Sequence, residues 1–265
     1  MFSRGYSAST ATLRARLASS ALARTSSAFN LVIRRPTSTM SHQLPQVEPY
    51  SQGKAKIRNV TPMQEGKWVE LRKVDWTDED GKDRVWEMAA RKTTSEGGID
   101  AVAIAAILKQ PQGGGPPRIP IILQYRPPIQ NICVEFPAGL IDEGESPEQS
   151  GIRELYEETG YGGEDFEGRI KMLEVGSTIV SDPGLSAANM SLVTLEVQLK
   201  EGEEEPKAHL DEGEHIDVRL IPIMELYAHL QAFEKLGYTV DARLHHYAAG
   251  IEVAKKLGGI GGAQL

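Results

Sequence analysis

The sequence predicts a mixed α/β fold, in which helices pack on the faces of a mixed sheet. Three observations predict this class. Short apolar runs rich in β-branched residues recur along the chain, as expected of strands buried in a sheet. One strongly capped helical segment lies between such runs, and two further helical segments follow the last of them. Strands and helices mixed in this order favour layers of helices on a shared sheet.

Composition divides the 265 residues into four segments. Residues 1–47 contain six Arg with many Ser, Ala and Thr but no Lys or acidic residue, which is typical of a mitochondrial transit peptide. A disordered basic tail is the alternative, and Met40 offers an internal start for a cytosolic or nuclear form. We expect an N-terminal β subdomain at 48–97, the main domain at 98–257 and a flexible Gly-rich tail at 258–265.

Charge and composition exclude several functional classes. Once the six Arg of residues 1–47 are set aside, the 29 basic residues fall to 23 against 37 acidic ones, a net charge of −14. Nucleic-acid binding needs a basic surface. No apolar run approaches the roughly 18 residues of a membrane span. Cys133 is the only cysteine, so no intramolecular disulfide forms, and its apolar neighbours predict that it packs in the core. We expect neither nucleic acid nor membrane as a partner.

The N-terminal part of the main region is predicted to be rich in strands. Residues 67–75 and 84–92 alternate in polarity, and the acidic turn at 78–81 joins them into a hairpin ahead of the main domain. Residues 99–108 and 119–125 are apolar and β-branched, and they flank a Pro- and Gly-rich loop.

Strands continue along the chain before two helices close it. Further strands are predicted at 133–136, 169–176, 191–197 and 216–221. Helices are predicted at 224–236 and at 242–256, the second with Asp241 as its N-cap. The acidic, Pro-containing stretch 201–213 is predicted to be a mobile surface loop.

The central helix has defined ends. Ser146 is its expected N-cap, Pro147 takes the first helical position, and Gln149 completes a capping box with Ser146. Gly160 is expected to end the helix, because a residue without Cβ adopts the left-handed closing turn most easily.

Two acidic residues of this helix are placed so that they repel. Ile152 and Leu155 share an apolar face, whereas Glu154 and Glu158 stack one turn apart on another face. Like charges at this spacing destabilise a helix by about 0.2–0.5 kcal/mol. Mg²⁺ prefers oxygen ligands and bridges protein carboxylates to phosphates, so the pair favours phosphate chemistry. From the helix alone, a solvated acidic face is the alternative.

The segment from Gly139 to Tyr161 resembles the Nudix box. The pattern is G-x5-E-x7-R-E-U-x-E-E-x-G-U, where U is an apolar residue, and the chain matches it at every charged position. The matching residues are Gly139, Glu145, Arg153, Glu154, Leu155, Glu157, Glu158 and Gly160. Tyr161 stands where an aliphatic residue is usual, and it keeps an apolar body there.

From about residue 65 to residue 257, the chain further resembles the ADP-ribose pyrophosphatase branch of the Nudix hydrolases. The stretches that carry this resemblance are GKWVELRKVDW, VWEMAARKTT, YRPPIQNICVEFPAGLIDEGE, SDPGLS and TVDARLHHYA. The resemblance implies the Nudix α/β/α sandwich with a mixed sheet, and an N-terminal β-hairpin subdomain that takes part in dimerisation.

The resemblance also implies an activity. It implies a homodimer that uses Mg²⁺ or Mn²⁺ to hydrolyse ADP-ribose and related ADP-sugars to AMP and ribose 5-phosphate or another sugar phosphate. One alternative is a pyrophosphatase for another nucleoside diphosphate derivative, such as a UDP-sugar, a dinucleotide or an oxidised nucleotide. A catalytically silent ADP-ribose-binding protein is a second alternative, but it predicts a broken box, and this box is intact.

By the same resemblance, the metal ligands are Glu154, Glu158, the backbone carbonyl of Ala138 and Glu214. Glu214 is implied to orient or deprotonate the attacking water, although from its own context it is one more exposed loop acid. The residues implied in catalysis are Arg153, Glu157, Glu158 and Glu214. Within this set Arg153 is expected to hold the carboxylates in place, and the general base stays open.

Substrate contacts are implied as well. Trp68 and Trp86 would stack on the adenine, with one ring from each subunit of a dimer. The remaining contacts are implied for Glu87 at the adenine edge, Arg91 and Arg126 at phosphate oxygens, Leu140 beside the metal-binding loop and Asp182 near the terminal ribose. From the sequence alone, Asp182 is equally a turn residue before Pro183.

Overall fold

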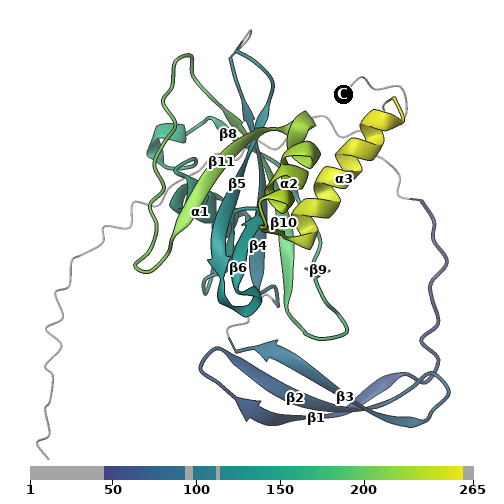
Figure 1. Cartoon of the computed structure of the whole chain (residues 1–265). Coiled ribbons are helices and arrows are strands. Elements are labelled where there is room, and N and C mark those ends of the chain that lie inside the picture. The colour runs from purple at the N-terminus through teal and green to yellow at the C-terminus, as the bar shows by residue number, and fades with distance from the viewer. Residues whose placement is uncertain (1–44, 93–97, 112–113, 259–265) are drawn as a thin grey trace, which may run out of the picture. The chain divides into compact units, whose positions relative to one another are not determined.

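The computed structural model describes residues 45–92, 98–111 and 114–258 (Figure 1). All but the last three residues of the expected transit segment 1–47 therefore lie outside the described part, as do residues 259–265 of the expected tail. Within the described ranges, no helix is long and apolar enough to cross a membrane.

The main sheet is mixed, as the sequence predicts. Its nine strands are β4 (Ala101–Lys109), β5 (Arg118–Arg126), β6 (Asn131–Glu135), β7 (Ala138–Leu140), β8 (Ile170–Val175), β9 (Ile179–Val180), β10 (Asn189–Gln198), β11 (Ile216–Pro222) and β12 (Thr239–Val240). The central order is β12-β6-β5-β4-β10-β8, while β11 pairs with β5, β7 with β4 and β9 with β10. β10 runs parallel to β4 and β12 parallel to β6, and the other pairs are antiparallel.

Helices cover both faces of this sheet (Figure 1). On β4, alternate side chains enter two separate cores, since successive residues of a strand point to opposite faces. Ala103 and Ala105 join the core beneath α2 (Leu226–Lys235) and α3 (Ala242–Lys256). Ile104 and Leu108 join the core beneath α1 (Pro147–Thr159). This arrangement confirms the predicted α/β/α sandwich.

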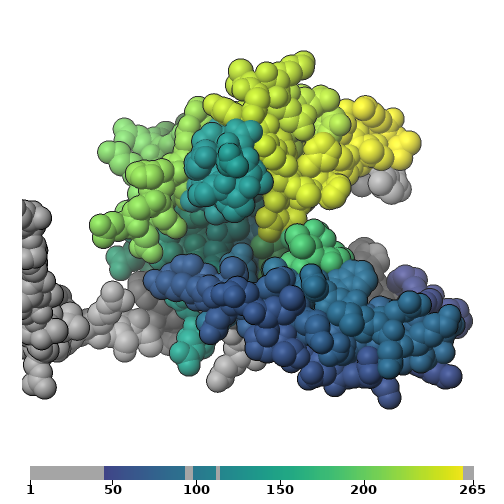
Figure 2. All heavy atoms as spheres, turned by 60° about the horizontal axis from the view of Figure 1, so that its bottom comes forward, coloured from purple at the N-terminus to yellow at the C-terminus, as the bar shows by residue number. Residues whose placement is uncertain are grey.

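The N-terminal sheet has one strand more than predicted. It consists of β1 (Lys56–Glu65), β2 (Val69–Thr77) and β3 (Asp83–Arg91), in that order, and Figure 2 shows its surface in blue. β2 and β3 are the expected hairpin, and the Asp78 carboxylate accepts hydrogen bonds from the amides of Asp80 and Lys82 in the turn. β1 was missed because every one of its residues is exposed, so its side chains carry no buried and exposed alternation.

The predicted strands and helices of the main domain are confirmed with small shifts at their ends. The strands that the sequence does not reveal are the short ones, β7, β9 and β12, which have two or three residues each. Cys133 is buried as expected, and burial raises the pKa of its thiol to about 12, so it stays protonated at neutral pH. These features concern the fold. The candidate site lies on α1 and the segments around it.

Candidate active site

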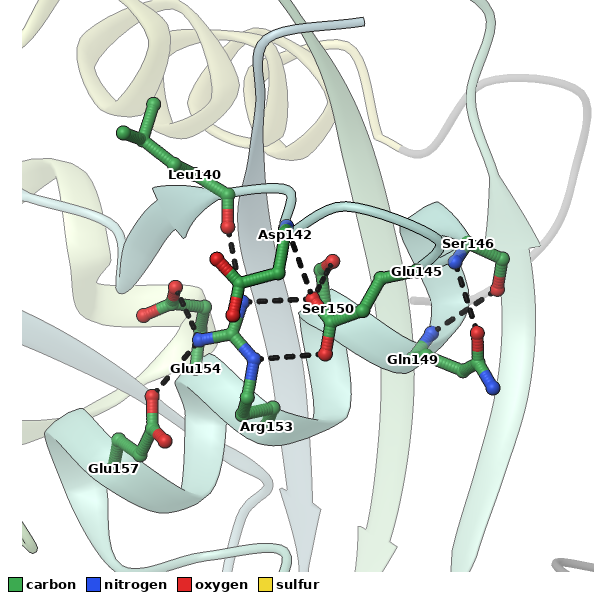
Figure 3. Close-up of polar contacts among 9 residues, drawn as sticks. All are labelled: Leu140, Asp142, Glu145, Ser146, Gln149, Ser150, Arg153, Glu154 and Glu157. Atoms are coloured by element: carbon green, nitrogen blue, oxygen red, sulfur yellow. Dashed lines mark hydrogen bonds and ion pairs between the residues drawn. The ribbon is translucent and has the colours of Figure 1, made fainter. Parts of the chain in front are cut away.

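Helix α1 begins and ends where the sequence predicts. The Ser146 hydroxyl accepts a hydrogen bond from the Gln149 amide at 3.3 Å, and the Gln149 side chain accepts one from the Ser146 amide at 2.9 Å (Figure 3). Gly160 closes the helix with φ of +80°. Leu155 and Thr159 are buried on the face toward the sheet. These contacts fix the rotation of the helix and therefore the direction of its acidic face.

Two glycines allow α1 to approach its neighbours closely. A Cβ on Gly139 would lie 1.9 Å from the Glu154 carboxylate, so the side chain of any other residue would displace that carboxylate. A Cβ on Gly151 would lie 2.9 Å from the side chain of Val193 on β10. The first glycine of the box is therefore required by the position of Glu154, and Gly151 lets the helix lie close to the sheet.

Arg153 lies at the centre of the acidic cluster (Figure 3). Its Nε and Nη2 atoms donate to the two carboxylate oxygens of Glu145 at 2.9 and 2.8 Å. Its Nη1 atom donates to Glu154 at 2.8 Å and to Glu157 at 2.9 Å, and Nη2 also donates to the carbonyl oxygen of Leu140 at 3.0 Å. The guanidinium thus joins the loop after β7 to α1 and contacts three carboxylates.

The carboxylates around Arg153 differ in their pKa values. The hydrogen bonds from Arg153, together with one from the Ser150 hydroxyl, lower the pKa of Glu145 to about 2. The same hydrogen bonds raise the pKa of Arg153. Glu145 is therefore ionised at all physiological pH values, and it serves as the fixed counter-charge of Arg153.

Glu154 and Glu158 are in the opposite situation. Glu158 is 5% exposed, and its Oε2 atom accepts a hydrogen bond from the Ala138 amide at 2.8 Å. Burial, followed by the charges of Glu154 and Glu214, raises the pKa of Glu158 to about 8. Burial also raises the pKa of Glu154, although Arg153 opposes this effect. Arg153 bonds to Glu154, yet the pKa of both carboxyl groups stays raised, so these oxygen donors fit a hard divalent cation.

Glu214 lies in the irregular segment between β10 and β11. Its carboxylate accepts a hydrogen bond from the Asp211 amide at 3.2 Å. It is near enough that its charge contributes to the raised pKa of both Glu154 and Glu158. Among the residues that the structure describes, no three acidic, His or Cys side chains already converge on one point as metal ligands would. The predicted ligands Glu154, Glu158 and Glu214 are thus electrostatic neighbours, although within the described residues they do not form a converged ligand set.

The comparisons agree with this geometry. A model of the NUDIX domain matches residues 99–242. An uncharacterized Nudix hydrolase of Schizosaccharomyces pombe is 39% identical over 206 residues, which cover 77% of this chain and 96% of the relative. The chain belongs to the Nudix hydrolase family.

Two further relatives of this Nudix hydrolase have names that state an activity. An ADP-ribose pyrophosphatase of Saccharomyces cerevisiae is 37% identical over 202 residues, covering 76% of this chain and 84% of the relative. An ADP-sugar pyrophosphatase of Mus musculus is 34% identical over 206 residues, covering 77% of this chain and 90% of the relative. The solved structure of an ADP compounds hydrolase aligns with a TM-score of 0.53 at 22% identity over 80% of this chain and all of the other, which shows the shared fold.

The Nudix hydrolase also contains an ion pair between a partly exposed Arg and a buried Glu, which sequence reasoning missed. Arg126 Nε and Nη2 donate to the two carboxylate oxygens of Glu135 at 2.6 and 3.1 Å, and Glu135 is buried. Arg126, predicted to pair with a phosphate, thus has a carboxylate partner in this structure. A buried acid at the end of the apolar strand β6 needs a cationic partner, but the sequence does not reveal that Arg126 is this partner.

The predicted substrate residues of β3 lie beside the loop that contains Asp182. The Ala89 amide donates to Leu185 O at 2.9 Å, and the Trp86 indole donates to Gly184 O at 3.0 Å. The Asp182 carbonyl accepts hydrogen bonds from the amides of Leu185 and Ser186, so the expected turn is also present. Glu87 and Arg91 are exposed on the same strand, and Leu140 is exposed at the end of β7.

Trp68, just before β2, and Trp86, on β3, are far apart within one chain. The Lys92 amide donates to Trp68 O, so Trp68 lies beside Lys92. Trp86 lies six residues before Lys92, and six residues of extended strand span about 20 Å. Trp68 and Trp86 are 61% and 49% exposed. Within one chain, the two rings are therefore too far apart to stack on the same small aromatic ring.

Proposed function

We propose that this Nudix hydrolase cleaves the pyrophosphate bond of ADP-ribose and related ADP-sugars, releasing AMP and ribose 5-phosphate or the corresponding sugar phosphate. The observation that carries the proposal is the complete Nudix box, folded so that Glu154 and Glu158 lie one turn apart on α1 and burial raises the pKa of both carboxyl groups. The names of the yeast and mouse relatives support ADP-ribose and ADP-sugars as the substrates.

The residues of the chain take separate roles in this proposal. Glu154, Glu158 and the carbonyl oxygen of Ala138 would hold Mg²⁺ or Mn²⁺, which supplies positive charge to the diphosphate oxygens and orients a water. Glu157 completes the acidic cluster through Arg153, which keeps the carboxylates in fixed positions. Glu214 approaches from the opposite segment and orients or deprotonates the water.

Substrate binding in this proposal uses the N-terminal sheet and the Asp182 loop. Trp68 and Trp86 from two subunits stack on the adenine, and Glu87 accepts a hydrogen bond from its edge. The remaining contacts come from Arg91 and Arg126 at the phosphates, Leu140 beside the box and Asp182 at the terminal ribose. Arg126 already donates to Glu135. To bind a phosphate oxygen, its guanidinium must either donate to both groups at once or release Glu135.

A homodimer is part of the same proposal. Large apolar side chains are exposed on the N-terminal sheet, including Trp68, Val69, Val85 and Trp86, and a second copy would cover them. We also propose that the full chain is mitochondrial and that a form starting at Met40 is cytosolic or nuclear. Light scattering tests the dimer, and imaging of the two forms in cells tests the localisation.

Release of nucleoside monophosphate by the purified full chain tests the proposed activity. We expect the highest kcat/KM for ADP-ribose or another ADP-sugar within a panel that also contains a UDP-sugar, a dinucleotide and an oxidised nucleotide. A preference for a uridine or guanine substrate would contradict the adenine sandwich. Tight binding of ADP-ribose without turnover in the presence of Mg²⁺ would instead favour a silent binding protein.

A further inference from the structure

The segment that contains Glu214 is more firmly attached than its composition predicts. We call residues 199–215, between β10 and β11, the Glu214 loop. It contains no helix or strand, as expected, but Arg169 donates two hydrogen bonds of 2.8 Å to the Glu203 carboxylate. Arg118 donates to Glu205 at 3.1 Å. Residues 201–213 thus form a surface loop, as predicted, and these basic residues attach the acidic side chains of its first part.

The middle of the Glu214 loop packs on the last turn of α1. A Cβ on Gly160 would lie 2.4 Å from the Lys207 carbonyl oxygen, so this glycine permits the contact. The His209 amide donates to the Glu157 carbonyl oxygen at 2.6 Å. The His209 imidazole stacks on the Tyr156 ring, with centroids 4.3 Å apart and planes at 23°.

Tyr156 is itself held from another side. A Cβ on Gly163 would lie 2.4 Å from the Tyr156 ring, so the ring lies against the backbone that follows α1. Tyr156 occupies a position of the Nudix box that the family pattern leaves unspecified. The imidazole of His209 therefore stacks on a ring that is already fixed on the catalytic helix.

Beyond His209 the loop has little other support. Glu214 is five residues further on, and β11 begins at Ile216. Between these points the backbone makes a turn in which the Glu214 amide donates to Asp211 O at 3.1 Å. Leu210 and Glu214 border a hollow of about 450 Å³ with Tyr125 and Tyr238, so dense packing does not hold the loop on that side. The position of Glu214 thus depends on the anchors at His209 and Ile216.

We propose that His209 is a positioning residue for the hydrolytic site. Its stack on Tyr156 fixes the last anchor before Glu214 and so sets the distance from the Glu214 carboxylate to Glu154 and Glu158. This inference rests on the proposed function. The stack connects the helix that bears one set of carboxylates directly to the loop that bears the other, and it does so outside the substrate site.

A double-mutant cycle in the full chain tests this coupling. The variants are His209→Ala, Glu214→Gln and the combination of both, with AMP release from ADP-ribose as the assay. We expect His209→Ala to lower kcat on the order of tenfold, because small misplacement of a reacting group is costly, and to change KM by less than about twofold. In the Glu214→Gln background, we expect His209→Ala to have no further effect.

Two more variants separate positioning from general stability. His209→Phe keeps a ring that can stack and keeps the backbone amide, so it should restore most of kcat. His245→Ala removes a His ring that packs against Tyr227, 5.8 Å between centroids, away from the site, and should leave kcat unchanged. The thermal midpoints of these variants should lie close to that of the wild-type protein.

A readout independent of activity is the rate of tryptic cleavage after Lys207, which lies in the anchored stretch. We expect His209→Ala to be cleaved there faster than the wild-type protein and His209→Phe at nearly the wild-type rate. Unchanged cleavage and unchanged kcat in His209→Ala would overturn the inference. So would an equal loss of kcat with and without the Glu214 carboxylate.

The outcomes also distinguish this inference from the proposed function. If the wild-type protein hydrolyses another nucleotide and not ADP-ribose, the substrate proposal fails, and the same cycle run on that nucleotide still decides the role of His209. If the wild-type protein hydrolyses ADP-ribose but Glu214→Gln has normal kcat, the function stands and the positioning role falls.

Discussion

Helix α1 and the N-terminal sheet differ in what surrounds their functional side chains. In α1, the box carboxylates are buried or bonded to groups of the same chain, and Glu158 is only 5% exposed. On the N-terminal sheet, Trp68 and Trp86 are 61% and 49% exposed and lie about 20 Å apart along the strands. The side chains of the box therefore contact one another within one chain, whereas the two tryptophans proposed to stack on the adenine do not. Variants in each region should accordingly fail in different ways.

The largest effect is expected from Glu158→Gln. The change keeps the size of the side chain but removes a charged oxygen ligand, so we expect kcat to fall on the order of a hundredfold to a thousandfold. Steady-state assays of AMP release measure this. Glu148→Gln, at the start of the same helix, is the matched control and should retain activity. Unchanged turnover and unchanged metal dependence in Glu158→Gln would contradict the assigned site.

Gly139→Ala tests whether the close approach of β7 and α1 matters. The new Cβ would lie 1.9 Å from the Glu154 carboxylate, so that side chain must move, and we expect kcat to fall on the order of a hundredfold. Gly250→Ala on α3 is the control, because its Cβ would meet nothing within 4 Å. That change should stabilise the protein by about 0.5–1 kcal/mol without altering kcat. Normal activity in Gly139→Ala would show that Glu154 tolerates displacement.

Val85→Glu tests the N-terminal sheet. Val85 is 60% exposed, so in a monomer the change should alter the free energy of unfolding by less than about 0.5 kcal/mol. In a dimer that covers this sheet, the new Glu side chain would bury a charge. We therefore expect light scattering to show monomers. We also expect KM to rise several-fold, which corresponds to a loss of about 1 kcal/mol of binding free energy. Val253→Glu, at a Val on α3 that is 52% exposed, should change neither. A stable dimer of the Val85 variant would place the interface elsewhere.

The smallest effect concerns the fold alone. Asp241 caps α3 and bonds to Arg243 at 2.7 Å. Burial tends to raise the pKa of Asp241, but the hydrogen bonds and charge of Arg243 lower it below the ordinary value. Since the folded pKa is the lower one, the stabilisation is present above the unfolded pKa of about 3.9 and is lost as the pH falls through the folded pKa.

Asp241→Asn should therefore cost about 1 kcal/mol at pH 7 and much less at pH 3. Urea unfolding at the two pH values measures this, and kcat at pH 7 should remain that of the wild-type protein. An equal cost at both pH values would show that the charge of Asp241 contributes no stability.

How far the sequence predicts this molecule depends on whether the signal is local. Ser146, Pro147, Gln149 and Gly160 act within one helix, so both ends of α1 were predicted to the residue. β1 was missed because its residues are all exposed, and β12 because a strand of two residues has no pattern of its own. Short strands exist through their pairing partners, which a single segment does not reveal.

In the site as well, local contacts are predictable from the sequence and long-range contacts are not. Arg153 and Glu157 stand one turn apart on α1, so their contact at 2.9 Å is local. The bond between Arg126 and Glu135 joins two strands in three dimensions, and the stack of His209 on Tyr156 joins residues more than 50 positions apart. Such contacts depend on tertiary packing, so no local pattern predicts them.

The central claim is that the carboxylates of α1 form a site for a divalent cation. Binding of Mn²⁺ to the full chain, followed by electron paramagnetic resonance without any nucleotide, tests it most directly. The account predicts that the wild-type protein and Glu148→Gln bind the ion with the same affinity and that Glu158→Gln binds it at least about tenfold more weakly. Equal affinity in all three proteins would contradict it.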